Sequence, residues 1–198
     1  MTLFEKRDIE ISVIEEQDKA KVLKYFQEND FNCDYESGSL RPSDSQFVKI
    51  MDDIISKKDD SSSIFVLKKK GEVIGYISMY VEYDRLHIGH IAVDKKERGK
   101  GYGTLMTKLA IAVAENEGRD VSLYCSKTNN CFDKLPFRKL DNVHYLYERK
   151  QKKKDKSLPQ IFISVEDYKI KRDNELKKEV ENFSKFLNSN IFDIMKDL

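Results

Sequence analysis

The sequence predicts a mixed α/β fold, an α+β arrangement in which helices flank a central sheet of antiparallel and parallel strands. Three short apolar segments, residues 64–67, 73–83 and 86–93, are separated only by brief polar turns, which indicates an antiparallel meander. A glycine-rich turn then leads into an amphipathic helix, and a further strand follows at residues 121–125. A strand, a crossover helix and a strand in this order imply a right-handed unit with one parallel pair.

The chain before the meander predicts one strand and two helices. Ile9, Ile11 and Val13 alternate with polar residues, as in a half-buried strand. A helical pattern begins at Asp18 and continues through Val22, Tyr25 and Phe26. The polar residues at 29–42 then predict a loop.

The second helix has a clear start signal. Ser43 and Gln46 have the spacing of a capping box, in which each side chain bonds the backbone of the other. Apolar residues then recur at helical spacing on one face; they are Phe47, Ile50, Met51, Ile54 and Ile55.

The helix after the glycine-rich turn carries Leu105, Leu109 and Val113 on one stripe, and Gly118 has the place of a C-cap. Beyond the strand at residues 121–125, residues 129–135 predict a short helix stopped by a proline. Residues 137–140 and 143–147 then predict a closing pair of strands.

An almost wholly charged run at residues 149–156 marks a domain boundary. We therefore expect one domain at residues 1–150, and a charged linker with a C-terminal amphipathic helical extension at residues 151–198. The apolar stripe of this extension would either dock on its own domain or form a homodimer; its members are Leu176, Val180, Phe183 and Leu187.

The composition narrows the class of protein. The 198 residues include 36 Lys and Arg against 35 Asp and Glu, a net charge of +1, which argues against nucleic acid as the main partner. Cys33, Cys125 and Cys131 lack the paired spacing of a metal site or a disulfide framework. No segment approaches the ~18 apolar residues of a membrane span, and the start lacks the apolar core of a signal peptide. We expect a soluble protein of the cytoplasm, with no metal and no membrane partner.

The glycine-rich turn is the strongest functional signal. Its sequence Arg98-Gly99-Lys100-Gly101-Tyr102-Gly103 has the form R-x-x-G-x-G. Alternate glycines allow a tight curl and close approach of a ligand, and the free N–H groups at a helix start attract phosphate. The pattern is neither a dinucleotide fingerprint nor a Gly-Lys-Ser/Thr loop. An ordinary tight turn is the alternative interpretation.

With the preceding Ile91-Ala92-Val93-Asp94 and the helix and strand that follow, this turn resembles the GNAT superfamily of acetyl-CoA-dependent N-acetyltransferases. The resemblance implies that acetyl-CoA is the co-substrate and that an amine is acetylated. It implies that the Ile91 N–H polarises the thioester carbonyl. The implied cofactor-binding residues are Ile91, Ala92 and Val93 beside the pantetheine arm, then Arg98, Gly99, Lys100, Gly101, Tyr102, Gly103 and Thr104 around the pyrophosphate, with Asn129, Asn130 and Phe132 further along.

Transfer to an amine requires loss of a proton near pH 7, and histidine is the side chain best suited to accept it. His87 occupies the position of the glutamate base of histone-acetylating members, four residues before Ile91. By strand alternation we expect His87 and His90 on opposite faces. Glu82 is a further candidate base, and an inert strand histidine is the alternative for His87.

The chain departs from the family pattern at the usual general acid. A tyrosine normally protonates the departing thiolate, and Phe132 stands at that position here. Tyr124, Tyr102 or water could substitute, or no acid is needed. The departure raises a rival hypothesis, a catalytically weakened CoA-binding regulatory or protein-interaction module. Acidic and aromatic residues at 29–45 favour a small cationic amine or a protein amine as acceptor.

Overall fold

The computed structural model describes residues 2–6, 8–28, 42–59, 61–125, 132, 135–140 and 144–149. Three predicted features lie outside these residues. They are most of the acidic and aromatic segment at residues 29–45, both asparagines at 129 and 130, and the whole extension from 151 to 198. The division into two domains therefore stays a prediction.

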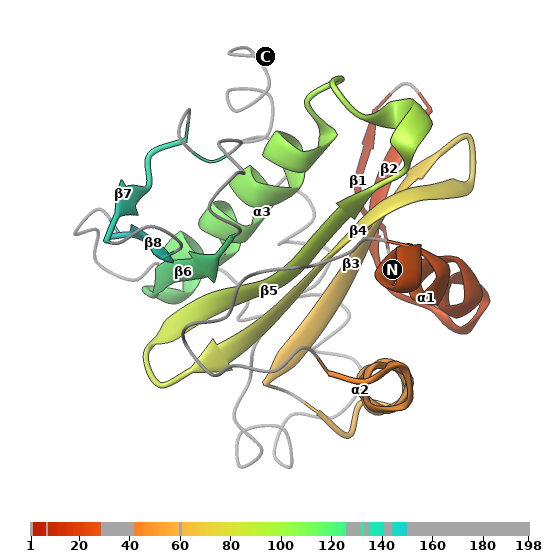
Figure 1. The fold of residues 1–198 in the computed structure, drawn as a ribbon, viewed down its shortest axis with the longest axis horizontal. Helices are drawn as coiled ribbons and strands as arrows, with labels where there is room; N and C mark the ends of the chain where they lie inside the picture. The colour runs from red at the N-terminus through yellow and green to blue at the C-terminus, as the bar shows by residue number, and fades with distance from the viewer. Residues whose placement is uncertain are drawn as a thin grey trace.

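The described residues form one eight-stranded sheet with the strand order β1-β2-β3-β4-β5-β6-β8-β7. Figure 1 shows the sheet, with β1 and β2 toward one edge and β7 and β8 toward the other. The strands are β1 (Thr2–Lys6), β2 (Ile9–Val13), β3 (Ser62–Lys69), β4 (Glu72–Glu82), β5 (Arg85–Val93), β6 (Asp120–Tyr124), β7 (Arg138–Lys139) and β8 (His144–Tyr147).

The pairing confirms the predicted meander and crossover. Strands β2 to β5 pair in succession as antiparallel neighbours. β5 and β6 are parallel, with Leu86 opposite Val121 and Ile88 opposite Leu123. β8 then pairs with β6, and β7 with β8, both antiparallel. One strand escaped prediction: β1, which pairs with β2 at the edge of the sheet.

Helix α3 (Tyr102–Glu117) covers one face of the sheet. Leu105, Leu109 and Val113 are buried there, as the sequence predicts, against apolar residues of β3 to β6 and β8. Gly118 ends the helix in the left-handed conformation at φ 68°, and its N–H donates to the Ala114 carbonyl. Figure 1 shows α3 on one side of the sheet and α1 and α2 on the other.

Helices α1 (Lys19–Glu28) and α2 (Asp44–Ile55) build a second core on the opposite face. A short 3-10 turn, η1 (Glu16–Asp18), leads into α1. The rings of Phe26 and Phe47 stack at a centroid distance of 4.0 Å between the two helices. The capping box of Ser43 and Gln46 at the start of α2 is present in both directions, so that prediction is confirmed.

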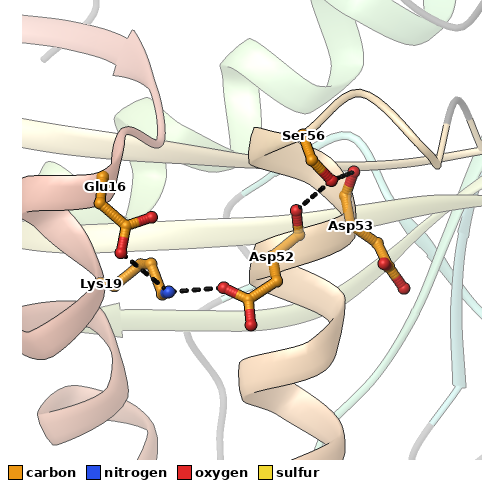
Figure 2. Close-up of polar contacts among 5 residues, drawn as sticks. All are labelled: Glu16, Lys19, Asp52, Asp53 and Ser56. Carbon is orange, nitrogen blue, oxygen red and sulfur yellow. Dashed lines mark hydrogen bonds and ion pairs between the residues drawn. The ribbon is translucent and has the colours of Figure 1, made fainter.

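Polar contacts fasten the outer ends of this helix pair. Lys19 at the start of α1 bridges Glu16 and Asp52, which lies near the end of α2 (Figure 2). Ser56 closes α2 by donating its hydroxyl to the Asp52 carbonyl at 2.6 Å. Among the described residues, none of the helices has the length and apolar character to cross a bilayer.

Candidate active site

A β-bulge in the middle of the sheet decides which way the residues of β5 face. Ser78 pairs with His90 and the next residue, Met79, pairs with Ile88, so Gly89 is an extra residue in β5. His87 lies opposite Tyr80 and His90 opposite Ser78, two β4 residues that share a face. The expectation that the two histidines face opposite sides is therefore wrong, because the bulge shifts the alternation by one residue.

Beyond the bulge, β5 separates from β6. The parallel pairing ends at Ile88 and Leu123, while β5 runs on to Val93. Gly89, His90 and Ile91 are half-buried although β5 is a central strand. Within the described residues, the second edge of β5 therefore lacks a paired strand from Gly89 onward.

The hydrogen-bond alternation shows which backbone groups line this open edge. The Asp94 N–H donates to the Ile74 carbonyl at 2.8 Å, so Asp94 is directed toward β4. Successive residues of a strand point to alternate sides in the sheet plane. The N–H and carbonyl groups of Val93 and Ile91 are therefore directed away from β4. Consistent with this, the Val93 carbonyl accepts from Arg98 Nε at 3.0 Å.

The glycine turn connects this open edge to the start of α3 through a 3-10 turn, η2 (Lys95–Glu97). Gly99 and Gly101 have φ of 76° and 82°, which favours glycine. Gly103 lies in the first turn of α3 without that constraint, and a Cβ at Gly99 or Gly103 would meet no atom within 4 Å. Gly101 is the N-cap and has no side chain to satisfy the first amides of α3. The turn thus presents free N–H groups to an open space.

Basic side chains adjoin the turn. Glu97 bonds both Lys100 at 2.9 Å and Lys69, at the end of β3, at 3.1 Å. These bonds, the one from Lys100 first, lower the pKa of the Glu97 carboxyl. The two ammonium groups are thereby held beside the N-terminus of α3, whose dipole also favours an anion. An open, basic helix start fits a pyrophosphate group.

A tyrosine that sequence reasoning missed secures the start of the turn. The Tyr25 hydroxyl on α1 lies 2.9 Å from Asp94 Oδ2 and 3.0 Å from the Val73 carbonyl oxygen. Asp94 Oδ1 accepts from the Lys96 N–H at 2.9 Å. Burial and the bond to Asp94 raise the pKa of the Tyr25 phenol, and the bonds from Lys96 and Tyr25 lower that of Asp94. Since 69 positions separate Tyr25 from Asp94, no local motif could reveal the contact.

His87 is buried at 5% exposure. A hydrogen bond of 3.0 Å joins its Nδ1 to Ser122 Oγ on β6. Burial, with a smaller contribution from the neighbouring His144, lowers the pKa of His87 to about 4. The imidazole is therefore neutral at pH 7 and is a weaker proton acceptor than an ordinary histidine.

The other candidate acids and bases differ in solvent exposure and in their distance from His87. Tyr124 at the end of β6 is half-buried, and its ring centroid is 5.4 Å from that of His87. Glu82 is exposed, opposite Arg85 at the far end of β5 from the glycine turn. His90 bonds Ser78 at 3.2 Å and contacts the rings of Phe26 and Phe47. The structure brings Tyr124 to His87 but not Glu82 to the turn.

Phe132, which stands where the family's tyrosine is expected, is a core residue. It is 8% exposed, and its ring packs against Phe137 and Tyr145. Cys125 is also buried in this core.

Comparison with known proteins agrees with the resemblance that the glycine turn suggests. The family model described as "Acetyltransferase (GNAT) family" matches residues 25–131. No curated protein gives a match. Among solved structures, similar folds include the PaiA N-acetyltransferase of Thermoplasma acidophilum in complex with coenzyme A. That pair has a TM-score of 0.56 and 13% identity, over 72% of this chain and 99% of the other.

Two further structures share the fold. A GNAT family acetyltransferase from Brucella melitensis in complex with acetyl-CoA has a TM-score of 0.52 and 15% identity, over 75% of this chain and 92% of the other. The ribosomal-protein-S5-alanine acetyltransferase from Vibrio fischeri has a TM-score of 0.53 and 18% identity, over 80% and 100%. With the family model matching more than half of its length, the chain belongs to the GNAT acetyltransferase family, and it is an acyltransferase that uses acetyl-CoA.

Proposed function

We propose that the protein transfers the acetyl group of acetyl-CoA to a primary amine by direct attack in a ternary complex. One observation carries the proposal: within the residues that the structure describes, an unpaired strand edge and a helix start without a side-chain cap adjoin along one continuous stretch of chain. The edge is that of β5 beyond Gly89, and the helix start is that of α3. A long donor with amide groups at one end and phosphates at the other matches this sequence of binding groups.

The turn from Arg98 to Thr104 would hold the pyrophosphate through backbone amides, with Lys100 adding positive charge. The pantetheine arm would lie along the edge of Ile91, Ala92 and Val93. Its amides could pair with the N–H and carbonyl groups that this edge directs away from β4. Asn129 and Asn130 stay predicted contacts outside the described residues, and Phe132 would contribute an apolar surface only.

In the reaction, the amine nitrogen forms a bond to the acetyl carbonyl carbon. The carbon–sulfur bond then breaks, and the proton that the amine gives up ends on the CoA sulfur. The Ile91 N–H would donate to the carbonyl oxygen as it gains negative charge, a role worth about 3 kcal/mol in enzymes that use it.

His87 would receive a hydrogen bond from the amine or from a relaying water. Its lowered pKa makes it a poor store for a proton. Tyr124, whose ring centroid is 5.4 Å from that of His87, would return a proton to the thiolate, and Glu82 would act only through solvent.

The acceptor is a small cationic amine or a protein amine. The Vibrio fischeri relative, which its name assigns to a ribosomal protein, favours the protein amine, and the acidic residues between positions 29 and 45 suit either. A cytoplasmic location also stays part of the proposal. A homodimer through the extension at 151–198 stays part of the proposal.

Gly103 offers a clean test of the donor site. Because φ is not constrained there and the space is open, Gly103→Gln and Gly103→Glu should both fold. Glycine inside a helix costs roughly 0.5–1 kcal/mol relative to alanine, so neither change should lower the unfolding temperature. Calorimetric titration with acetyl-CoA should show weaker binding to both variants than to the parent, and much the weaker binding to Gly103→Glu.

The two variants differ by one charge at nearly equal size, so their ratio measures the electrostatic part of binding. If both bind acetyl-CoA as tightly as the parent chain, the pyrophosphate does not sit at this turn. Gly71, in the β3–β4 turn with φ +81°, provides a control: Gly71→Asn should leave acetyl-CoA binding unchanged.

A second function is favoured by one observation, the burial of Phe132 where the family places a tyrosine. A chain without that acid could bind acetyl-CoA and act as a regulatory or interaction module. Release of free CoA thiol, measured over a panel of primary amines, separates the two functions. Turnover above hydrolysis with any amine supports the enzyme, whereas tight binding without turnover supports the module.

A further inference from the structure

Four rings form a continuous row across the sheet next to the place where β5 and β6 separate. We name Tyr80, His87, Tyr124 and His144 the ring row; they come from β4, β5, β6 and β8. Successive ring centroids are 4.8, 5.4 and 4.6 Å apart. Such distances are typical of aromatic contacts that stabilise one another.

The ring row lies on the face that α1 and α2 cover only in part. The register places Tyr80, His87 and Tyr124 on the same face as Tyr76, which belongs to the core beneath α1 and α2. Tyr80 is nevertheless 39% exposed, and Tyr124 and His144 are half-buried. The row is thus accessible in part, and it adjoins the open edge on which the thioester would lie.

The ring row would attract a cation through its ring faces and not through a net negative charge around it. The phenol rings carry no charge at neutral pH, and burial keeps His87 neutral by lowering its pKa to about 4. One residue pair further along the same face, Glu82 lies opposite Arg85, which lies opposite Asp120. Arg149 also pairs with Asp120, with its Nε 4.0 Å from Oδ1, so these four charges sum to zero. Ring faces themselves attract cations through their quadrupole.

We propose that the ring row binds a positively charged group of the acceptor other than the amine that attacks, so that the preferred substrates carry a second, cationic group. This inference rests on the proposed acetyl transfer and names its substrate class. A carboxylate-bearing or phosphate-bearing acceptor would gain little on this surface, because the described residues of the row supply ring faces and hydroxyl groups instead of fixed positive charge.

The test uses two probes of the same shape that cannot be acetylated on nitrogen. Choline carries a quaternary ammonium group, and 3,3-dimethyl-1-butanol is its uncharged carbon counterpart. Each is titrated against the full chain saturated with CoA, with binding followed by ligand-observed NMR. We expect choline to bind between about 2-fold and 30-fold more tightly, the range that a cation over an aromatic ring produces.

Variants assign the preference to the ring row. Tyr80→Leu and Tyr124→Leu should each reduce the choline preference, whereas Tyr80→Phe, which keeps the ring, should retain it. Tyr83 is 94% exposed on the same hairpin and outside the row, so Tyr83→Leu should change nothing. Equal binding of the two probes, or a preference that survives both leucine variants, would overturn the inference.

The experiment also separates this inference from the proposed function. Acetyl-CoA titration reports on the donor site alone. If acetyl-CoA fails to bind while the choline preference persists, the cation site stands and the proposed acetyl transfer falls. If acetyl-CoA binds and an amine is acetylated without any choline preference, the transfer stands and the ring row is not the acceptor site.

Discussion

His87 is neutral at physiological pH because burial separates its imidazole from water. We predict that kcat/KM for an amine acceptor shows no inflection between pH 6 and 7. The rate should instead rise with pH until the pKa of the amine itself is reached, since only the free base attacks. His87→Gln should lower the rate by less than the roughly 100-fold of a full general base. An inflection near pH 6.5 that disappears in His87→Gln would show that His87 stores the proton.

The same pKa has a consequence for stability that serves as a control. The folded chain keeps His87 neutral down to about pH 4, whereas the unfolded chain takes up the proton near pH 6.5. Stability due to this group is therefore complete above pH 6.5 and declines as the pH falls toward 4. In His87→Gln, denaturant unfolding should lose this part of the pH dependence, whatever the effect on the rate.

Gly89 illustrates the limit of prediction at single residues. Strict alternation placed His87 and His90 on opposite faces, but the extra residue at Gly89 brings both to one face. A lone glycine inside an apolar strand is a recognised bulge signal, so the sequence held a hint. The glycines at 99 and 101 were easier to interpret, because their left-handed φ is required by the turn itself.

At the scale of elements, a hydrogen bond from Tyr25 connects α1 to Asp94 at the start of the glycine turn. We predict that Tyr25→Phe lowers the free energy of unfolding by about 1 kcal/mol, because Asp94 and the Val73 carbonyl lose a shared donor. We also predict that the KM for acetyl-CoA rises several-fold while the KM for the amine does not. The first readout is urea unfolding, and the second is steady-state kinetics.

Asp94→Asn is the matched variant, because its amide oxygen can still accept from Tyr25 or from the Lys96 N–H. It should weaken acetyl-CoA binding less than Tyr25→Phe combined with Asp94→Ala. Should Tyr25→Phe reduce stability and leave acetyl-CoA binding untouched, Tyr25 supports the fold without positioning the turn.

Most elements were predictable because their signals are local. The capping box of α2, the apolar stripe of α3 and the C-cap at Gly118 each involve neighbouring residues. β1 was missed because its five residues include few apolar ones and depend on pairing with β2. The ring row was missed as a unit because four strands contribute one ring each, and only the sheet register brings His144 next to Tyr124.

At the scale of the molecule, the two cores lie on opposite faces of one sheet. The core beneath α3 holds β5 and β6 together up to Ile88, and the core beneath α1 and α2 holds Ala92 of β5 on the other face. β5 is therefore packed on both faces, while its C-terminal half, from Gly89 onward, separates from β6. The sequence predicted the strand order across this point but not where the parallel pairing ends.

The open edge of β5 should show its exposure in the rates of amide hydrogen exchange. Amide protons that face water exchange quickly with solvent deuterium, and those bonded to a partner exchange slowly. In the free chain, Ile91 and Val93 should exchange fast while Ala92, directed toward β4, stays protected. Among these three residues of β5, acetyl-CoA should slow only Ile91 and Val93, which hydrogen exchange followed by NMR would resolve residue by residue. The donor would then pair with the open edge of the sheet. Its binding would stabilise the folded chain by an amount that rises with the logarithm of the donor concentration divided by Kd.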